Sequence, residues 1–157
     1  MSEHKASIRW THSQGDFLKG SYSREHTWSF DGGVTVPASP SPTSVKPPYS
    51  NAANVDPEEA YVAAISSCHM LTFLWIAGRR GFVVDSYRDE AVGVLSRDAE
   101  GTLAMTSVTL RPAVTFAGGR VPTVEEHDAM HHEAHEQCFI AQSVKTPVRC
   151  EPVATGV

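Results

Sequence analysis

A helix-start signal followed by a long uncharged apolar run constrains this chain more than any other feature. Asp56 can cap a helix, the proline after it suits the first helical position, and Glu58 and Glu59 lie where the helix dipole favours negative charge. Glu59 also falls three residues after Asp56, which is the spacing of a capping box. Residues 60–77 contain no Asp, Glu, Lys or Arg. The pattern predicts a helix over residues 57–78, and a soluble protein would bury it almost all round.

Length, composition and charge bound the class of protein. The 157 residues are 41% hydrophobic and 20% charged, which is typical of one globular domain over residues 1–157 rather than of a disordered chain. The net charge is −5 and the largest basic cluster is the pair Arg79 and Arg80. Nucleic acid is therefore not an expected partner.

Three features bear on the compartment. Residues 1–5 are followed by no apolar segment, so we expect no secretory signal. The run over residues 60–77 approaches the length of a membrane span, but Ser, His and Thr interrupt it and the rest of the chain is polar, so we expect no membrane partner. Three cysteines without a signal favour a reducing cytoplasm, where a disulfide is more often catalytic than structural.

Alternating patterns and turn residues outline the rest of the chain. Before the long helix we expect strands over residues 5–11, 17–22, 25–30 and 34–37, a turn at residues 15–16 and an exposed Pro-rich loop over residues 38–55. After it we expect strands over residues 82–96 and 103–116 joined by a turn at 98–101, a second helix over 122–138 and a closing strand over 144–151. This order of elements is typical of an α+β fold.

A thiol lies next to an imidazole halfway along the first predicted helix. Cys68 and His69 follow two serines, which makes this part of the apolar run polar. A cysteine in a buried helix is usually a small core residue, but polar groups in a core require partners or a function. A second cysteine, Cys138, lies near the end of the second predicted helix. Cys68 is therefore the first candidate for chemistry, with core packing as the competing interpretation.

The spacing of these residues resembles the OsmC/Ohr family, the osmotically inducible protein C and organic hydroperoxide resistance proteins. The chain has Asp-Pro-Glu-Glu at residues 56–59, ten residues from Glu58 to Cys68, and Cys138 seventy residues later. Family members have Asn-Pro-Glu-Gln or Asn-Pro-Glu-Glu, then Ala-Cys-Phe, and later a Cys-Pro motif. The order of strands and helices is also similar over nearly the whole chain. The resemblance implies an OsmC-like α+β fold, with antiparallel sheets around a long buried helix, and an intertwined homodimer.

The activity that the resemblance implies is that of a thiol peroxidase. Cys68 would attack the terminal oxygen of a hydroperoxide, with organic hydroperoxides favoured, to give an alcohol and a sulfenic acid. Cys138 would then form a disulfide with Cys68, and a dithiol, in the family often lipoyl-based, would reduce it. The resemblance implies no cofactor and no metal.

The nucleophile must be a thiolate, and the resemblance also implies how it is stabilised. Burial alone raises the pKa of a thiol, so a cation must lie nearby. In the family this cation is an arginine held by the carboxylate of the Pro-Glu motif, which Glu58 matches. Arg9 and Arg24 are both candidates, and we favour Arg24 because its spacing of thirty-four residues from Glu58 is similar to that of the Ohr branch. The competing interpretation of Arg24 is a solvent-exposed strand residue.

Helix geometry limits how Glu58 can act. Ten residues at 1.5 Å rise separate Glu58 and Cys68 by roughly 15 Å along a straight helix. Glu58 therefore cannot contact Cys68 of its own helix. Either an arginine bridges them or the other chain of a dimer supplies part of the site, which fits the long loop over residues 38–55.

The chain departs from the family pattern in two places. His69 takes the place of the phenylalanine after the first cysteine, and Phe139 rather than proline follows Cys138. Only Gln142 resembles the OsmC branch in this second segment. The third cysteine, Cys150, alternates with valines on one face of the closing strand, so we interpret it as a core residue.

The histidines support a rival hypothesis. His127, His131 and His135 recur every four residues and therefore lie along one stripe of a helix. Such a stripe is able to bind zinc or another transition metal, although a polar helix face is the more ordinary interpretation. A site with His69 and Cys68 has weaker support. The alternative function is thus a non-catalytic metal- or ligand-binding protein that uses His131 and His135.

Overall fold

The structure is a computed structural model, and it describes residues 1–153. The chain forms two compact units, Met1–Ala60 and Tyr61–Val157. That residues 1–157 form a single domain stays a prediction.

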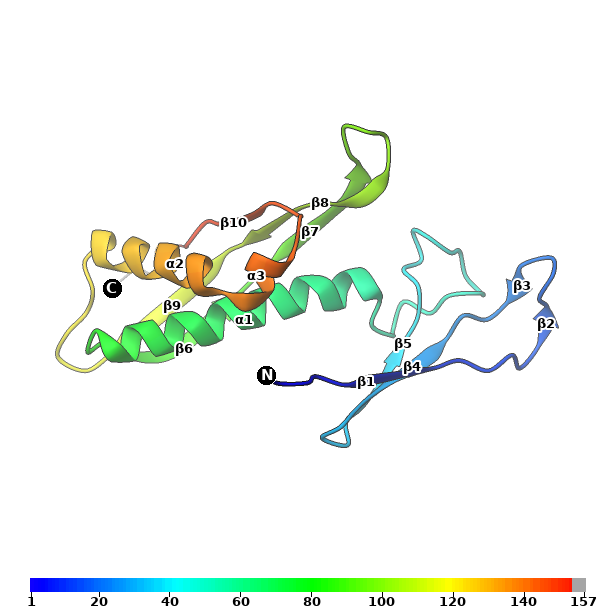
Figure 1. The fold of residues 1–157 in the computed structure, drawn as a ribbon, viewed down its shortest axis with the longest axis horizontal. Helices are drawn as coiled ribbons and strands as arrows, with labels where there is room; N and C mark the ends of the chain where they lie inside the picture. Colours follow the sequence, from blue (N-terminus) through cyan, green and yellow to red (C-terminus); the bar gives the residue numbers. More distant parts are fainter. Residues whose placement is uncertain (154–157) are drawn as a thin grey trace. The chain divides into compact units, whose positions relative to one another are not determined.

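The N-terminal unit contains a three-stranded antiparallel sheet and a small hairpin (Figure 1). The sheet has the order β1-β4-β5, with β1 over Ala6–Arg9, β4 over His26–Phe30 and β5 over Thr35–Ala38. The hairpin pairs β2 (Gly15–Asp16) with β3 (Ser21–Tyr22). Three of the four predicted strands are therefore present, with bounds that differ by no more than two residues.

Three local predictions for this unit differ from the structure. Residues 15–16 form a strand rather than a turn, because the chain turns instead at residues 17–20: the Gly20 N–H donates to the Phe17 carbonyl (3.1 Å) and the Lys19 N–H to the Asp16 carboxylate (3.2 Å). The predicted strand over residues 17–22 is reduced to its last two residues. The loop over residues 38–55 is also not fully exposed, since Ser39 is buried and its Oγ accepts a hydrogen bond from the Asn51 N–H (2.8 Å).

Helix α1 (Pro57–Arg79) begins where the sequence predicts it. The Glu59 N–H donates to the Asp56 carboxylate (2.7 Å) and the Asp56 N–H donates to the Glu59 carboxylate (3.1 Å). These two bonds are the predicted capping box, and they satisfy donors that a helix N-terminus otherwise leaves without partners.

The C-terminal unit contains a three-stranded sheet, a two-stranded sheet and two further helices. Its strands are β6 (Val83–Asp89), β7 (Val92–Arg97), β8 (Leu103–Leu110), β9 (Pro112–Ala117) and β10 (Val148–Cys150). β7 pairs antiparallel with β8, β10 runs parallel to β8 on its other side, and β6 pairs antiparallel with β9. The helices are α2 (Val124–Gln137) and α3 (Phe139–Ser143). Strands and helices follow one another as an α+β fold requires, which confirms the predicted class.

Each of the two long strands predicted after α1 is divided into two. The break comes between β6 and β7 on one side and between β8 and β9 on the other. There the Asp89 carboxylate accepts a hydrogen bond from the Arg111 N–H (2.6 Å), so that N–H is not used in the sheet, and Pro112 has no N–H to offer. The predicted turn at residues 98–101 is confirmed, with the Gly101 N–H donating to the Asp98 carbonyl (3.0 Å).

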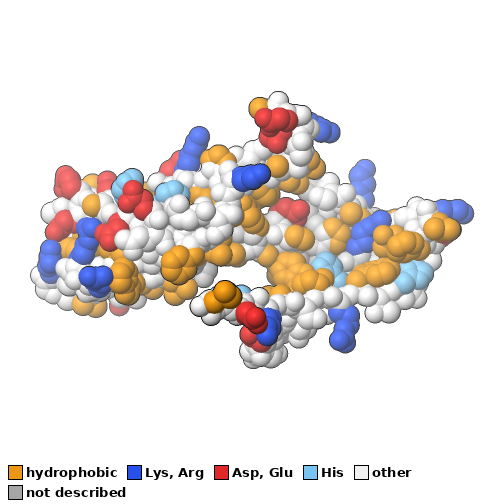
Figure 2. Space-filling model, viewed as in Figure 1, with side chains coloured by type: hydrophobic (Ala, Val, Ile, Leu, Met, Phe, Trp, Pro, Cys, Tyr) orange, Lys and Arg blue, Asp and Glu red, His pale blue; other side chains and the backbone are white. Residues whose placement is uncertain are grey.

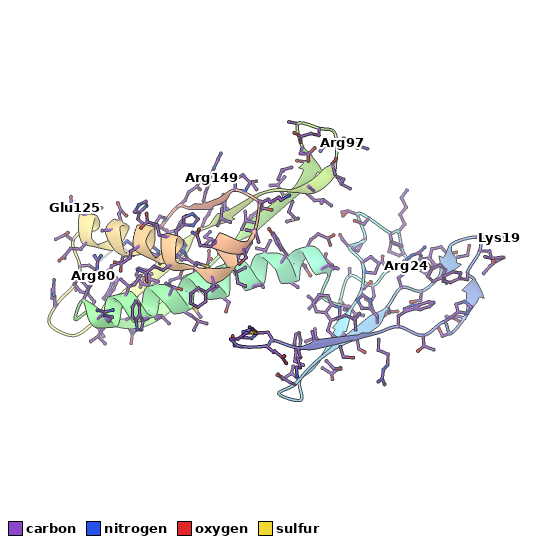
Figure 3. All side chains as sticks on the ribbon, viewed as in Figure 1. Lys19, Arg24, Arg80, Arg97, Glu125 and Arg149 are labelled. Atoms are coloured by element: carbon purple, nitrogen blue, oxygen red, sulfur yellow. The ribbon has the colours of Figure 1, made fainter. Side chains whose placement is uncertain are left out.

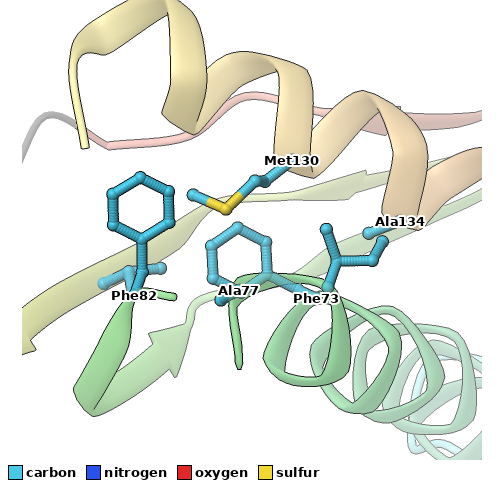
Figure 4. Close-up of a cluster of buried hydrophobic side chains, with 7 residues drawn as sticks. Phe73, Ala77, Phe82, Met130 and Ala134 are labelled. Carbon is cyan, nitrogen blue, oxygen red and sulfur yellow. The ribbon is translucent and has the colours of Figure 1, made fainter. Parts of the chain in front are cut away.

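The main core lies where α2 packs along the C-terminal half of α1. Figure 4 shows this cluster, in which Phe73 and Ala77 of α1 meet Met130 and Ala134 of α2, with Phe82 closing one end. All five side chains are buried. The cluster holds the two helices that carry the candidate functional residues.

The expectation that α1 is buried almost all round is wrong for a single chain. Only one face is buried, whereas Leu71 and Trp75 are 61% and 52% exposed. Figure 2 shows hydrophobic side chains on the open face of this helix. By length and composition α1 is able to cross a membrane, as are the core helices of many soluble proteins, and 28% of its most apolar stretch is buried.

Gly93 controls how closely β7 approaches α1. A Cβ at this position would lie 2.4 Å from Val62 Cγ2 and 2.5 Å from Met105 Cε, so the valine backbone would have to move. We expect Gly93→Ala to lower the free energy of unfolding by about 1–3 kcal/mol through overpacking. Urea denaturation measures this. Gly119→Ala is the control, since a Cβ there has open space. Equal unfolding midpoints for Gly93→Ala and wild type would contradict this packing.

Candidate functional site

The structure brings Cys68 and Cys138 together although they are seventy residues apart. Cys68 lies midway along α1, and Cys138 lies between α2 and α3 as the cap of α3. The Cys68 thiol lies near enough to Cys138 to raise its pKa. Both are free cysteines, with Cys68 half-buried and Cys138 fully buried. A solute can therefore reach Cys68, while Cys138 lies behind it.

The surroundings of Cys138 keep its thiol protonated. Burial, followed by the neighbouring Cys68 thiol, raises the pKa of Cys138 to about 11. Backbone N–H groups at the start of α3 act in the opposite direction, including the Ala141 N–H, which donates to the sulfur (3.4 Å). The net effect is that Cys138 is a neutral thiol at neutral pH.

An apolar pocket of about 540 Å³ lies along the same face of α1 as Cys68. Leu71, Thr72 and Trp75 line it, and they follow Cys68 by three, four and seven residues, which places them on one face of the helix. The other lining residues come from α2, its C-terminal end and α3: Glu136, Gln137, Phe139 and Gln142. This pocket begins about one helical turn from Cys68 and offers room for a hydrocarbon group.

Arg24 and Glu58 both lie in the N-terminal unit and form no salt bridge within the described chain. The Arg24 guanidinium donates to the carbonyls of Tyr22 (3.1 Å) and Gly20 (3.2 Å) and lies 4.2 Å from the Tyr22 ring centroid. It is half-buried just after β3 (Figure 3), so it is not the solvent-exposed strand residue of the competing interpretation. Arg9, the other candidate, is exposed on β1.

Arg24 also lines a largely aromatic pocket of about 490 Å³ within this unit. The pocket is lined further by Ile8, Trp10, Phe17, Tyr22, His26, Pro40 and Pro57. The guanidinium is thus a cation set in apolar surroundings, where its field is screened less than on an open surface.

A second cluster joins His69, His131 and Cys150. His69 Nε2 lies 3.0 Å from His131 Nδ1, and the Cys150 sulfur lies 3.6 Å and 3.8 Å from these two nitrogens. The other ring nitrogen of His131 lies 3.2 Å from His127 Nε2. Of the predicted histidine stripe, His131 belongs to this cluster, and its partners His69 and Cys150 come from α1 and β10.

Sequence reasoning missed this cluster because each member suits a core on its own. Cys150 does pack at the edge of a core cluster, as predicted, but it also contacts both imidazoles. The available signal was His69, a titratable residue in an otherwise uncharged run. Although His69 directly follows Cys68 in the sequence, its side chain is buried and packs against His131.

Burial determines the charge state of this second cluster. Burial, then the neighbouring His135, lowers the pKa of His69 to about 4. Burial, then His127 and His69, lowers the pKa of His131 to about 3. Burial, then the carboxylates of Asp89, Asp128 and Glu151, raises the pKa of Cys150 to about 12. At neutral pH the cluster therefore consists of two neutral imidazoles and a thiol.

Solved structures with a similar fold cover almost the whole chain. An OsmC-like protein of unknown function from Vibrio cholerae is 51% identical, with a TM-score of 0.95, and the match covers 98% of this chain and 100% of that one. An organic hydroperoxide resistance protein from Elizabethkingia anophelis is 14% identical (TM-score 0.70; 97% and 94% covered), and the organic hydroperoxide resistance protein OhrB of Bacillus subtilis is 18% identical (TM-score 0.66; 97% and 98% covered). The last two show a shared fold. No curated protein matches the chain.

A sequence model of the OsmC-like protein family matches residues 50–152. The match includes α1, both cysteines of the thiol pair and the whole second cluster. It confirms the resemblance and the OsmC-like α+β fold predicted from the sequence. The chain belongs to the OsmC-like protein family.

Proposed function

We propose that this protein is a thiol peroxidase that reduces organic hydroperoxides to alcohols, with Cys68 as nucleophile and Cys138 as resolving cysteine. The observation that carries the proposal is the pair of neighbouring thiols, one half-exposed and one buried. Their unequal surroundings support unequal roles. Peroxide can reach Cys68, and the raised pKa of Cys138 keeps it as a thiol until Cys68 has been oxidised.

The reaction balances with these two residues and one external reductant. The Cys68 thiolate attacks the terminal peroxide oxygen, the O–O bond breaks, and the alkoxide takes a proton and leaves as the alcohol. The sulfur, oxidised by two electrons, is now a sulfenic acid. Cys138 sulfur then attacks Cys68 sulfur, an S–S bond replaces the S–O bond, and the hydroxide leaves as water with the thiol proton of Cys138. A dithiol, with a lipoyl group as the proposed source, restores both thiols.

The apolar pocket supports organic rather than inorganic peroxides. We expect Phe139→Ala to lower kcat/KM for cumene hydroperoxide about 5–30-fold, which corresponds to about 1–2 kcal/mol of lost apolar contact. The value for hydrogen peroxide, which has no hydrocarbon group, should change little. Phe139 is 82% exposed, so its loss leaves the core intact. Leu103→Ala, at an exposed position outside the pocket, is the control. Equal losses for both peroxides would contradict this role for the pocket.

We further propose that Arg24, held by Glu58, polarises the site and that the site is completed in an intertwined homodimer. Two observations support this. Helix geometry prevents Glu58 from reaching Cys68 of its own helix. In addition, one face of α1 leaves Leu71 and Trp75 exposed, and a second chain would cover the pocket that they line. Three free thiols fit the reducing cytoplasm in which such an antioxidant protein would act in the response to oxidative stress.

Steady-state turnover tests the proposed function. Purified protein, cumene hydroperoxide and dihydrolipoamide should together give catalytic loss of peroxide with one alcohol formed per dithiol oxidised. Loss of peroxide at the rate of the uncatalysed mixture would reject the proposal.

A further inference from the structure

We propose that His69, His131 and Cys150 form a zinc site on the C-terminal unit, separate from the thiol pair. The ligand atoms are His69 Nε2, His131 Nδ1 and Cys150 Sγ, which all lie within 4.8 Å of one another. This inference departs from the sequence-based expectation of no metal, and it does not depend on peroxidase activity.

The distances between the three atoms are close to the edges of a tetrahedral zinc site. Zinc–nitrogen bonds of about 2.0–2.1 Å and a zinc–sulfur bond of about 2.3 Å place two nitrogens roughly 3.3 Å apart and a nitrogen and a sulfur roughly 3.6 Å apart. The observed distances are 3.0 Å between the nitrogens and 3.6 Å and 3.8 Å to the sulfur. The observed separations therefore differ from those of a zinc site by about 0.3 Å or less.

The donor set also suits zinc chemically. Two neutral imidazoles and one thiolate are ligands of borderline softness, which zinc accepts readily. The carboxylates of Asp89, Asp128 and Glu151 create a negative potential at Cys150. This potential opposes a lone thiolate but favours a divalent cation bound to it.

The protons of the cluster can be placed when the ion binds. Cys150 loses its proton to solvent, and the proton between His69 and His131 moves to His69 Nδ1. This nitrogen is buried and has no hydrogen-bond partner among residues 1–153, so it is free to take the proton. His131 Nε2–H then donates to His127 Nε2, an outer contact that fixes the ring of a metal-ligating histidine.

A fourth ligand position faces solvent. His131 and Cys150 line a pocket of about 320 Å³ together with Asp128, His132, His135, Val148 and Pro152. Water can therefore enter and complete the tetrahedron. The ion would join α1, α2 and β10, so its binding should stabilise the folded C-terminal unit.

Metal titration of the reduced, tag-free full chain tests the site. After treatment with a chelator and a phosphine reductant, the protein should bind one equivalent of Zn²⁺ and show a higher Tm. Co²⁺ as a probe should give the near-ultraviolet charge-transfer band of a cobalt–thiolate bond. Cys150→Ser should remove this band and lower affinity at least tenfold, and His127→Phe, which keeps the aromatic packing, should lower affinity about 10–100-fold.

Two controls separate this site from other metal-binding groups. Cys68→Ser should retain the stoichiometry and the band, because Cys68 is not a ligand. His4→Ala should do the same, since His4 is an exposed histidine of the N-terminal unit. Circular dichroism confirms that each variant is folded. Absence of stoichiometric binding by the wild type, survival of the band in Cys150→Ser, or its loss in Cys68→Ser would each overturn the proposal.

Discussion

Cys68→Ser is expected to reduce peroxidase turnover by on the order of 10³-fold or more, the loss typical of removing a catalytic nucleophile. A serine hydroxyl at this position ionises far less readily than a thiol and does not carry the two-electron oxidation. The side chains are similar in size, so the fold should be retained. Turnover of cumene hydroperoxide with dihydrolipoamide measures the effect, and Ser67→Ala, an exposed neighbour on α1, serves as the control.

Cys138→Ser should behave differently because it removes the second step rather than the first. One equivalent of peroxide should still be consumed rapidly, leaving a sulfenic acid on Cys68 that a dimedone reagent traps, while steady-state turnover falls. If Cys68→Ser turns over peroxide as well as Cys138→Ser does, the two roles assigned here are not correct.

Arg24→Ala is expected to lower kcat/KM by about 10²–10³-fold, the range for removing one preorganised electrostatic contact. The physical reason is that a guanidinium near the thiol favours its ionised form, which is the nucleophile. Arg24→Lys should recover part of the rate, since it keeps the charge but loses the planar fork that also bonds the Tyr22 and Gly20 carbonyls.

The pH profile separates electrostatic from structural effects at Arg24. If Arg24 acts through its charge, Arg24→Ala should lower the rate more at low pH than at high pH, because the cation favours the ionised nucleophile. A purely structural role would lower Tm without moving the profile. Arg9→Ala is the matched control on exposed β1. A larger loss for Arg9→Ala than for Arg24→Ala would identify Arg9 as the cation.

Local signals in the sequence were the most reliable guide to the fold. The capping box at Asp56 involves groups within three residues of each other, and α1 begins where this signal places it. The prediction of two undivided long strands was wrong because their division depends on residues that are far apart in the sequence. Their division depends on the hydrogen bond from the Arg111 N–H to Asp89, which joins positions that no short window connects.

The candidate sites differ in the same way: one is related by a sequence pattern and the other is formed only by folding. The thiol pair could be predicted because a family pattern relates Cys68 and Cys138 by spacing, and the structure brings these two thiols together. The second cluster has no such pattern. Its members, His69, His131 and Cys150, come from two helices and a strand and meet only because α2 packs on α1 and β10 pairs with β8. Only the folded chain brings their ring nitrogens and sulfur together.

The central claim is that Cys68 and Cys138 form one redox pair, and peptide mapping of the oxidised protein tests it most directly. Reduced protein is mixed with one equivalent of cumene hydroperoxide per chain, remaining thiols are blocked by alkylation, and the peptides are identified by mass spectrometry. The account predicts a disulfide that joins Cys68 to Cys138, with Cys150 alkylated. A reduced Cys68, or a disulfide that joins Cys68 to Cys150, would contradict it.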